Sequence, residues 1–243
     1  MKNKILILLS IVSICATLVV CSLILIKPNV LLRKPGGISV KGYAVQKVVS
    51  DIGEWACAIN ARAATQKEAY LKLKNDLSKS VEFIKSKGAP ADAVTIGGIS
   101  AYPVKSRDKN GYLTEDVIAW VASATIGIQS ADVALIYELN AKSSELNELG
   151  IEISNSNTRY FYTNLESLKL ELIGRASANA RERAQKLAGT SGGKLGGVLS
   201  ASQGVFQITR PLSTETSDWG MYETGTIEKE VKCTVNVQFA VEK

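Results

Sequence analysis

Apolar residues recur every three or four positions over residues 163–189, the longest helical pattern in the chain. Thr163 and Glu166 match a capping box at its start, and Gly189 stands where a left-handed residue would end the helix. The pattern predicts a helix that packs along a sheet through a single face. The predicted apolar stripe consists of Leu165, Leu168, Leu172, Ala176, Ala180, Ala184 and Leu187.

Alternation of apolar and polar residues with a period of two predicts strands elsewhere in the chain. The clearest alternation is in the last strand, where the apolar set is Ile227, Val231, Cys233, Val235, Val237, Phe239 and Val241. Similar signals predict strands at residues 38–49, 54–64, 94–107, 120–128, 151–162 and 195–203. Pro103 marks its strand as an edge strand or a bulged one, because proline cannot donate to a ladder.

Two more helices are predicted from their start signals. Thr65 and Glu68 form a capping box for a helix that ends at Gly88, and Asp132 starts another that ends at Gly150. The elements then follow one another in the order β-β-α, β-β-α, β-α-β-β. Hairpins separated by crossing helices predict an α+β fold, with largely antiparallel sheet and helices packed on one face of it.

Residues 5–26 form an uncharged, mostly apolar run of 22 residues at the amino terminus. A helix of that length spans a hydrocarbon core of about 30 Å. The alternative is a cleaved signal peptide, whose apolar part is usually shorter and ends in a small-x-small site. We therefore expect an N-terminal transmembrane helix that anchors the chain to a membrane within residues 1–27, a linker at 28–37 and a folded domain at 38–243.

The net charge of +6 is concentrated at the amino terminus. Residues 1–34 contain five basic residues and no acidic one, which leaves 24 basic and 23 acidic residues in the rest of the chain. A nearly neutral folded domain has no broad basic surface to attract nucleic acid. Nucleic-acid binding is therefore not expected.

The chain contains no histidine. This excludes Ser-His-Asp and Cys-His catalysis, as well as metal sites that use imidazole ligands. The glycines at 189–193 precede Lys194 but lack the spacing and the following Ser or Thr of a phosphate-binding loop. We expect no catalytic residues, no metal and no cofactor, and hence a protein that is not an enzyme.

Two groups of side chains allow two interpretations each. Cys57 and Cys233 lie on the apolar phase of separate predicted strands, so they are either buried thiols or a disulfide between the first hairpin and the last strand. Arg175, Arg181 and Arg183 are either an anion site or a solvated helix face that alternates with acidic residues.

Residues 205–225 form the least regular part of the sequence and are rich in Ser, Thr and Gly. A connection of this length is either functional or mobile. Arg210, Trp219, Met221 and Tyr222 are its candidate interaction residues, because aromatic side chains in a polar loop have little reason to occur unless they dock on a surface. That surface belongs either to the chain itself or to a partner.

Several motifs occur in a fixed order along the chain. ISVKGYAV opens the first strand, TQKEA starts the first helix of the folded domain, and ASANARERAQKLAG leads through a glycine turn to KLGGVLSAS. TIEKEVKCTVNVQFAVE forms the alternating end. Together these motifs resemble the SIMPL-domain family of exported bacterial proteins, and the resemblance covers essentially everything after Gly37.

The resemblance implies an exported or envelope-associated protein linked to stress defence, including oxidative stress, with its folded domain outside the cytoplasm. Some members assemble into ring-like oligomers, which implies a homo-oligomer. The family has no established catalytic residues to transfer. The expected function is therefore that of a non-enzymatic, membrane-anchored envelope protein acting through self-assembly or partner docking. The alternative is a small-molecule or peptide-binding module that uses residues 205–225.

Overall fold

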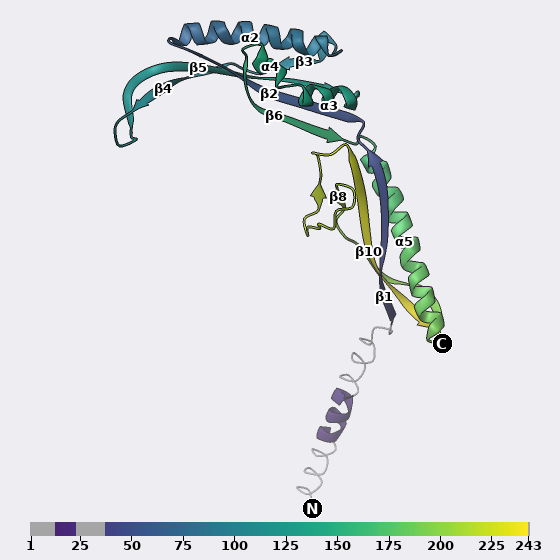
Figure 1. Ribbon diagram of the computed structural model, residues 1–243. Helices are drawn as coiled ribbons and strands as arrows, with labels where there is room; N and C mark the ends of the chain where they lie inside the picture. Colours follow the sequence, from purple (N-terminus) through teal and green to yellow (C-terminus); the bar gives the residue numbers. More distant parts are fainter. Residues whose placement is uncertain (1–12, 23–36, 243) are drawn as a thin grey trace, which may run out of the picture. The chain divides into compact units, whose positions relative to one another are not determined.

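The computed structural model describes residues 13–22 and 37–242 (Figure 1). The helices of the folded domain are α2 (Gln66–Ser86), α3 (Val133–Ala141), α4 (Glu145–Glu148) and α5 (Leu165–Thr190), with a 3-10 turn η1 (Ala91–Ala93). The strands are β1 (Gly37–Val49), β2 (Ile52–Ala63), β3 (Val94–Ile96), β4 (Ser100–Arg107), β5 (Leu113–Ser130), β6 (Glu152–Phe161), β7 (Lys194–Gln203), β8 (Gln207–Thr209), β9 (Met221–Tyr222) and β10 (Glu228–Glu242). The α+β class is confirmed.

The strands form two sheets. Sheet A has the order β1-β10-β8-β9, with β7 also paired to β10, and sheet B has the order β3-β5-β2-β6, with β4 also paired to β5. All pairs in sheet B are antiparallel, whereas β8 and β9 run parallel to each other. The prediction of largely antiparallel sheet is confirmed.

The predicted hairpin between the first two strands is wrong. β1 belongs to sheet A and β2 to sheet B, because β5 and β6 occupy the two edges of β2. The connection at residues 50–51 is held by both sheets: the Ser50 N–H donates to the Ile227 carbonyl, and the Asp51 N–H donates to the Phe161 carbonyl (both 2.9 Å).

The chain divides into two compact units. The described part of the smaller unit comprises residues 13–22, 37–42, 178–202 and 235–242, and the larger unit comprises residues 43–177 and 203–234. β1, α5 and β10 each contribute residues to both units. All of sheet B and the whole 205–225 segment belong to the larger unit.

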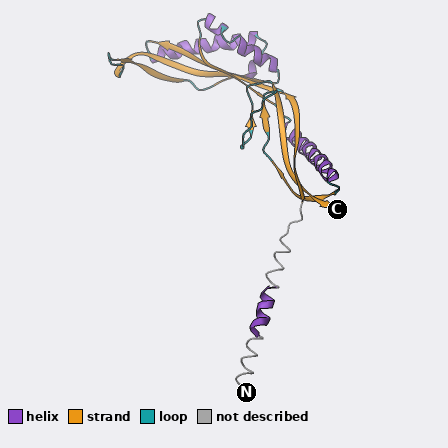
Figure 2. Cartoon of the chain, turned by 60° about the horizontal axis from the view of Figure 1, so that its bottom comes forward, coloured by secondary structure: helices purple, strands orange, loops and turns teal. Residues whose placement is uncertain are grey.

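The core of the larger unit lies on one face of sheet B, which α2, α3 and α4 cover (Figures 1 and 2). Alternate residues of β2 and β5 point into it, as the period of two predicts. Gly53 allows α3 to approach closely, since a Cβ at this position would lie 2.9 Å from Ile136 Cγ1. The core cluster includes Trp55, Cys57, Ile59, Leu73, Ile84, Ile126, Ile136 and Leu139.

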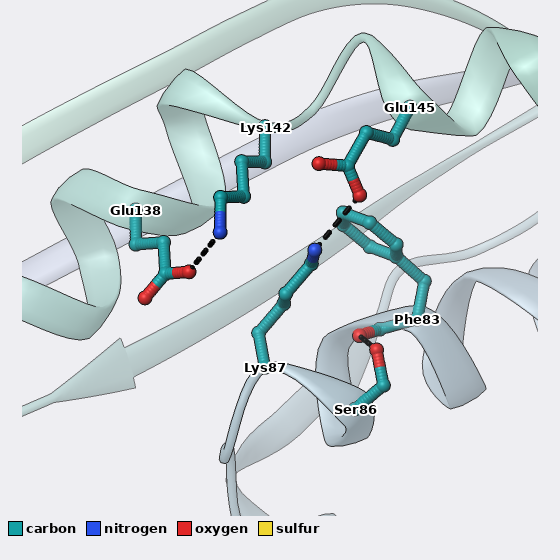
Figure 3. Close-up of polar contacts among 6 residues, drawn as sticks. All are labelled: Phe83, Ser86, Lys87, Glu138, Lys142 and Glu145. Atoms are coloured by element: carbon teal, nitrogen blue, oxygen red, sulfur yellow. Dashed lines mark hydrogen bonds and ion pairs between the residues drawn. The ribbon is translucent and has the colours of Figure 1, made fainter.

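Two ends of covering helices are linked by a partly buried ion pair (Figure 3). Lys87, at the C-cap of α2, lies 2.8 Å from the carboxylate of Glu145, the first residue of α4. The Lys87 ammonium also lies 5.0 Å from the centroid of the Phe83 ring. Glu138 and Lys142 form a separate, exposed pair one turn apart at the end of α3. The Lys87–Glu145 pair therefore links the end of α2 to the start of α4.

The start signals of two helices are confirmed. The Glu68 N–H donates to Thr65 Oγ1 (3.2 Å) while the Thr65 N–H donates to the Glu68 carboxylate (3.1 Å), completing the capping box. The Asp132 carboxylate accepts from the Leu135 N–H at the start of α3. The region predicted as one helix up to Gly150 contains the two short helices α3 and α4.

Both predicted ends of the long helix are wrong. The N–H and hydroxyl of Thr163 donate to the two carboxylate oxygens of Asp51 (2.9 and 2.7 Å), so this side chain holds the 50–51 connection, and α5 begins at Leu165. At the other end, α5 continues through Gly189 to Thr190, and Gly192 is the residue in the left-handed region, with φ of 73°.

The apolar stripe of α5 is confirmed except for its last member. Leu187 is 51% exposed, whereas Ala188 is 1% exposed and continues the four-residue spacing from Ala184. The other stripe residues are buried. Alanine therefore forms the whole buried face of the second half of the helix.

The predicted strand at 94–107 is interrupted at residues 97–99, which separate β3 from β4. β3 and β4 pair along the same side of β5, so β4 is an edge strand, as Pro103 indicates. The ladder between β4 and β5 also shifts register at Val104/Lys105. β4 is therefore both an edge strand and an irregularly paired one.

Within residues 13–22 and 37–242, no helix is long and apolar enough to cross a membrane. The apolar run at 5–26, predicted as a transmembrane helix, lies largely outside the described residues. Its described part, residues 13–22, is helical.

Candidate docking site

The 205–225 segment is folded against the larger unit. β8 pairs with β10, with Ile208 opposite Val231, and β9 pairs with β8. The Glu223 N–H donates to the Ile208 carbonyl (2.9 Å), and the Tyr160 N–H donates to the carbonyl of Thr224 (2.8 Å). A connection predicted to be either functional or mobile is therefore anchored at both of its ends.

A network of hydrogen bonds fixes the turn that carries Trp219. The Gln207 side-chain amide donates to the Ser217 carbonyl (2.6 Å) and accepts from the Ser217 N–H (3.2 Å). The Ser217 hydroxyl accepts from the Trp219 N–H, and the Ser217 carbonyl accepts from the Gly220 N–H. Gly220 has φ of 85°, and a Cβ there would lie 2.9 Å from the Phe206 carbonyl, so the turn requires glycine.

Trp219 is the most exposed of the large apolar side chains in the described chain, at 95% of its surface. It borders a hollow of about 530 Å³. Tyr222 is 48% exposed and Met221 is half-buried. The walls of this hollow include Lys169, Val205, Phe206, Ile208, Met221 and Tyr222. An exposed indole therefore lies at the border of a hollow that the 205–225 segment forms together with Lys169 of α5.

One basic residue lines the hollow, and one acidic residue adjoins Trp219 in the sequence. Lys169, from the first half of α5, is on its wall, 2.7 Å from the Glu166 carboxylate and 5.8 Å from the centroid of the Phe206 ring. Asp218 is exposed and directly precedes Trp219. The projecting side chain is thus next to an acid, while the wall carries a base.

The structure brings together three of the four candidate residues. Trp219, Met221 and Tyr222 all line the hollow, but Arg210 does not. Arg210 instead lies 3.6 Å from the Glu215 carboxylate, and both side chains are about 60% exposed. An exposed pair of this kind contributes little to stability. Lys169, Val205 and Phe206 were not predicted from the sequence as part of this site.

Cys57 and Cys233 are free, buried thiols. Cys57 belongs to β2 in sheet B and Cys233 to β10 in sheet A, so each packs as a small apolar side chain in its own sheet. The alternative, a disulfide between them, is not formed in the structure. Burial raises the pKa of the Cys57 thiol to about 11 and also raises the pKa of Cys233.

Two of the three arginines on α5 bind backbone oxygens of β1, the strand at one end of sheet A. Arg175 donates to the Val45 carbonyl (3.2 Å) and to the Gln46 side chain (2.9 Å), and Arg183 donates to the Lys41 carbonyl (3.1 Å). The two interpretations from the sequence, an anion site and a solvated face, both missed this role. An edge strand carries unpaired backbone groups, which arginine donors satisfy here.

The burial of charged residues at the start of β10 was also not predicted from the sequence. Lys229 is 1% exposed, and its ammonium donates to the Thr226 carbonyl. Burial lowers the pKa of Lys229, while the charge of Glu223 opposes that shift. Lys232 donates to the Ser213 carbonyl (2.5 Å), which ties the 205–225 segment to β10. A pattern of alternating residues cannot reveal that a loop covers the polar side of a strand.

Across the described residues, no group of three or more Cys, Asp or Glu side chains is placed to hold a metal ion. The features that the structure shows at this site are an exposed aromatic residue, a hollow and a hydrogen-bonded turn.

The fold and the site define a two-sheet α+β protein that presents a fixed aromatic side chain at its surface. The chain belongs to the SIMPL family: the family model, described as a protein of unknown function (DUF541), matches residues 38–239. The match includes both sheets and the whole 205–225 segment, and it confirms the resemblance found in the sequence motifs. No curated protein matches the chain.

Proposed function

We propose that this chain is a non-enzymatic, membrane-anchored protein of the cell envelope that acts by self-assembly through the surface around Trp219. The exposure of Trp219 on a hydrogen-bonded turn is the observation that carries this proposal. Tryptophan is enriched among the residues that dominate binding energy at interfaces. A side chain on an ordered backbone loses less conformational entropy on association than one on a mobile loop.

The anchor and the location are part of the same proposal. The apolar run at residues 5–26 has the length of a membrane-spanning helix and supports membrane attachment. The resemblance to exported SIMPL proteins supports a folded domain outside the cytoplasm and a role in stress defence. A near-neutral folded domain offers no broad basic surface, so nucleic acid is not a proposed partner.

A second candidate function is favoured by the hollow itself. Its volume of about 530 Å³ lies within the range of sites that hold small molecules. Phe206, Met221 and Tyr222 provide apolar walls, and Lys169 provides one cation. A small molecule or a short peptide with an apolar part is the ligand that this lining would accept.

Analytical ultracentrifugation of the full chain in a mild detergent distinguishes the two candidates. Self-assembly predicts an oligomer that dissociates when Trp219 and Tyr222 are both replaced by alanine. A monomer at high concentration would remove the assembly proposal and favour the binding module. An oligomer unaffected by the double substitution would retain assembly but place its interface elsewhere.

A further inference from the structure

The surface around Trp219 has a projecting side chain and, beside it, a hollow that could receive one. Trp219 projects from the segment with 95% of its surface exposed, and the hollow beside it is large enough for a second indole ring. Trp219 also forms part of the rim of this hollow. A ring that enters the hollow therefore meets the first indole, and aromatic pairs favour such offset stacking.

A projection and a hollow that lie side by side on one surface can be matched to those of a second copy by a two-fold axis. In a two-fold contact each residue pair occurs twice, so the Trp219 ring of each copy can enter the hollow of the other. We infer that two copies of this chain exchange their Trp219 side chains in this way. The inference rests on the proposed assembly function and names its interface, its symmetry and its partner.

The charges near the hollow favour a second copy as the occupant. Asp218 accompanies the projecting Trp219, while Lys169 lies on the wall that receives the ring. In the exchanged arrangement, Asp218 of each copy comes next to Lys169 of the other, and this opposite-charge pair forms twice. The existing partner of Lys169, Glu166, has an 85% exposed side chain, and such an exposed pair does not restrain the lysine strongly.

Photo-crosslinking of the full chain tests the contact directly. Benzoylphenylalanine is placed at position 219, and unlabelled protein is mixed with ¹⁵N-labelled protein in mild detergent before irradiation. The inference predicts crosslinks between labelled and unlabelled copies, attached at Lys169 or within residues 203–208 or 219–222. Crosslinks confined to a single copy, crosslinks to any other surface, or an absence of crosslinks would overturn it.

A matched pair of substitutions distinguishes this contact from nonspecific association through exposed apolar side chains. Trp219→Ala should raise the dissociation constant of the full chain at least about 30-fold, as expected for a dominant interface residue. Leu212→Ala is the control, because Leu212 is 87% exposed on the same segment but does not line the hollow. The control should leave the dissociation constant within about twofold, and an equal effect of both substitutions would refute the exchange.

Charge reversal tests the two-fold geometry. Asp218→Lys and Lys169→Asp should each weaken association about two- to fivefold, the range for an exposed ion pair. The chain with both substitutions should recover the original dissociation constant, since each contact again joins opposite charges. Lack of recovery would contradict the exchanged pairing. An oligomer that forms without these contacts would end this inference alone, whereas a monomeric chain would end the proposed assembly as well.

Discussion

The core on sheet B and the 205–225 segment keep their shapes by different means. The core buries apolar side chains from β2, β5, α2 and α3, and its largest member, Trp55, is 1% exposed. The segment is fixed by polar contacts around Gln207 and Ser217, and it leaves Trp219 95% exposed. Apolar burial stabilises a fold, whereas a hydrogen-bonded turn can hold an apolar side chain in solvent. The difference separates a tryptophan that is buried in the core from one that the fold leaves exposed to solvent.

The largest effect is expected when the two tryptophans are compared. Trp55→Ala leaves a cavity in the core and should lower the free energy of unfolding by about 3–5 kcal/mol. It also removes the hydrogen bond from Trp55 Nε1 to Ser156 Oγ (3.0 Å). Trp219→Ala should change the free energy of unfolding by less than about 0.5 kcal/mol, as for other surface changes. Urea denaturation of both variants at a concentration where the chain is monomeric measures the two values.

A similar loss from both substitutions would show that Trp219 packs against the protein. That result would remove the contrast between the two regions and, with it, the main support for an interface at this residue.

Gly220 tests whether the segment is as rigid as its contacts indicate. Gly220→Ala places a Cβ 2.9 Å from the Phe206 carbonyl at a backbone φ of 85°, so it should cost about 1–3 kcal/mol. Gly98→Ala is the control, because a Cβ at Gly98 has no atom within 4 Å and its φ is not in the left-handed region. Denaturation curves that do not distinguish the two variants would mean that the turn adapts, and that Trp219 is not held in one position.

The two regions also differ in how well the sequence predicted them. Periodicity predicted the strands at 54–64 and 120–128 and placed Cys57 on the apolar phase of the first, where it is buried, because a strand covered on one face has a period of two. It could not assign β1 and β2 to different sheets, since that depends on which strands occupy the edges of β2. Local sequence favours the elements, whereas pairing between distant strands decides their arrangement.

The candidate site was predicted only in part, for a related reason. Composition identified Trp219 and Tyr222, because aromatic residues are unusual in a polar loop. Lys169 and Phe206 carried no comparable signal, as each looks ordinary in its own helix or loop. They join the site only when α5 and the 205–225 segment come together in the folded larger unit. Arg210 was included because of its position in the loop, but it lies outside the hollow.

An intermediate loss of stability is expected at alkaline pH, and it arises from a single buried thiol in the core. Burial raises the pKa of Cys57 from 9.0 to about 11, so the folded chain retains a proton that the unfolded chain releases. The resulting contribution to stability is complete below pH 9 and is lost as the pH rises toward 11. The free energy of unfolding of the wild type should therefore fall by up to about 1.4 kcal/mol per pH unit in this range, relative to that of Cys57→Ala. Urea unfolding at pH 8, 9 and 10 measures the difference, and parallel curves would show that the thiol ionises freely in the folded chain.

The smallest effect on global stability, and the most local one, is expected from Gln207→Leu. The substitution keeps the approximate size of the side chain but removes both hydrogen bonds to Ser217, each worth about 0.5–1.5 kcal/mol. Because these bonds restrain a surface turn, most of the loss should appear as local motion. With 5-fluorotryptophan incorporated, the ¹⁹F resonance of Trp219, assigned with Trp219→Phe, should sharpen while that of Trp55 remains unchanged. Gln129→Leu, an exposed change on β5, is the control and should leave both resonances as they are. If the Trp219 resonance is already narrow in the wild type, the turn does not fix the indole, and the entropic advantage assigned to this surface disappears.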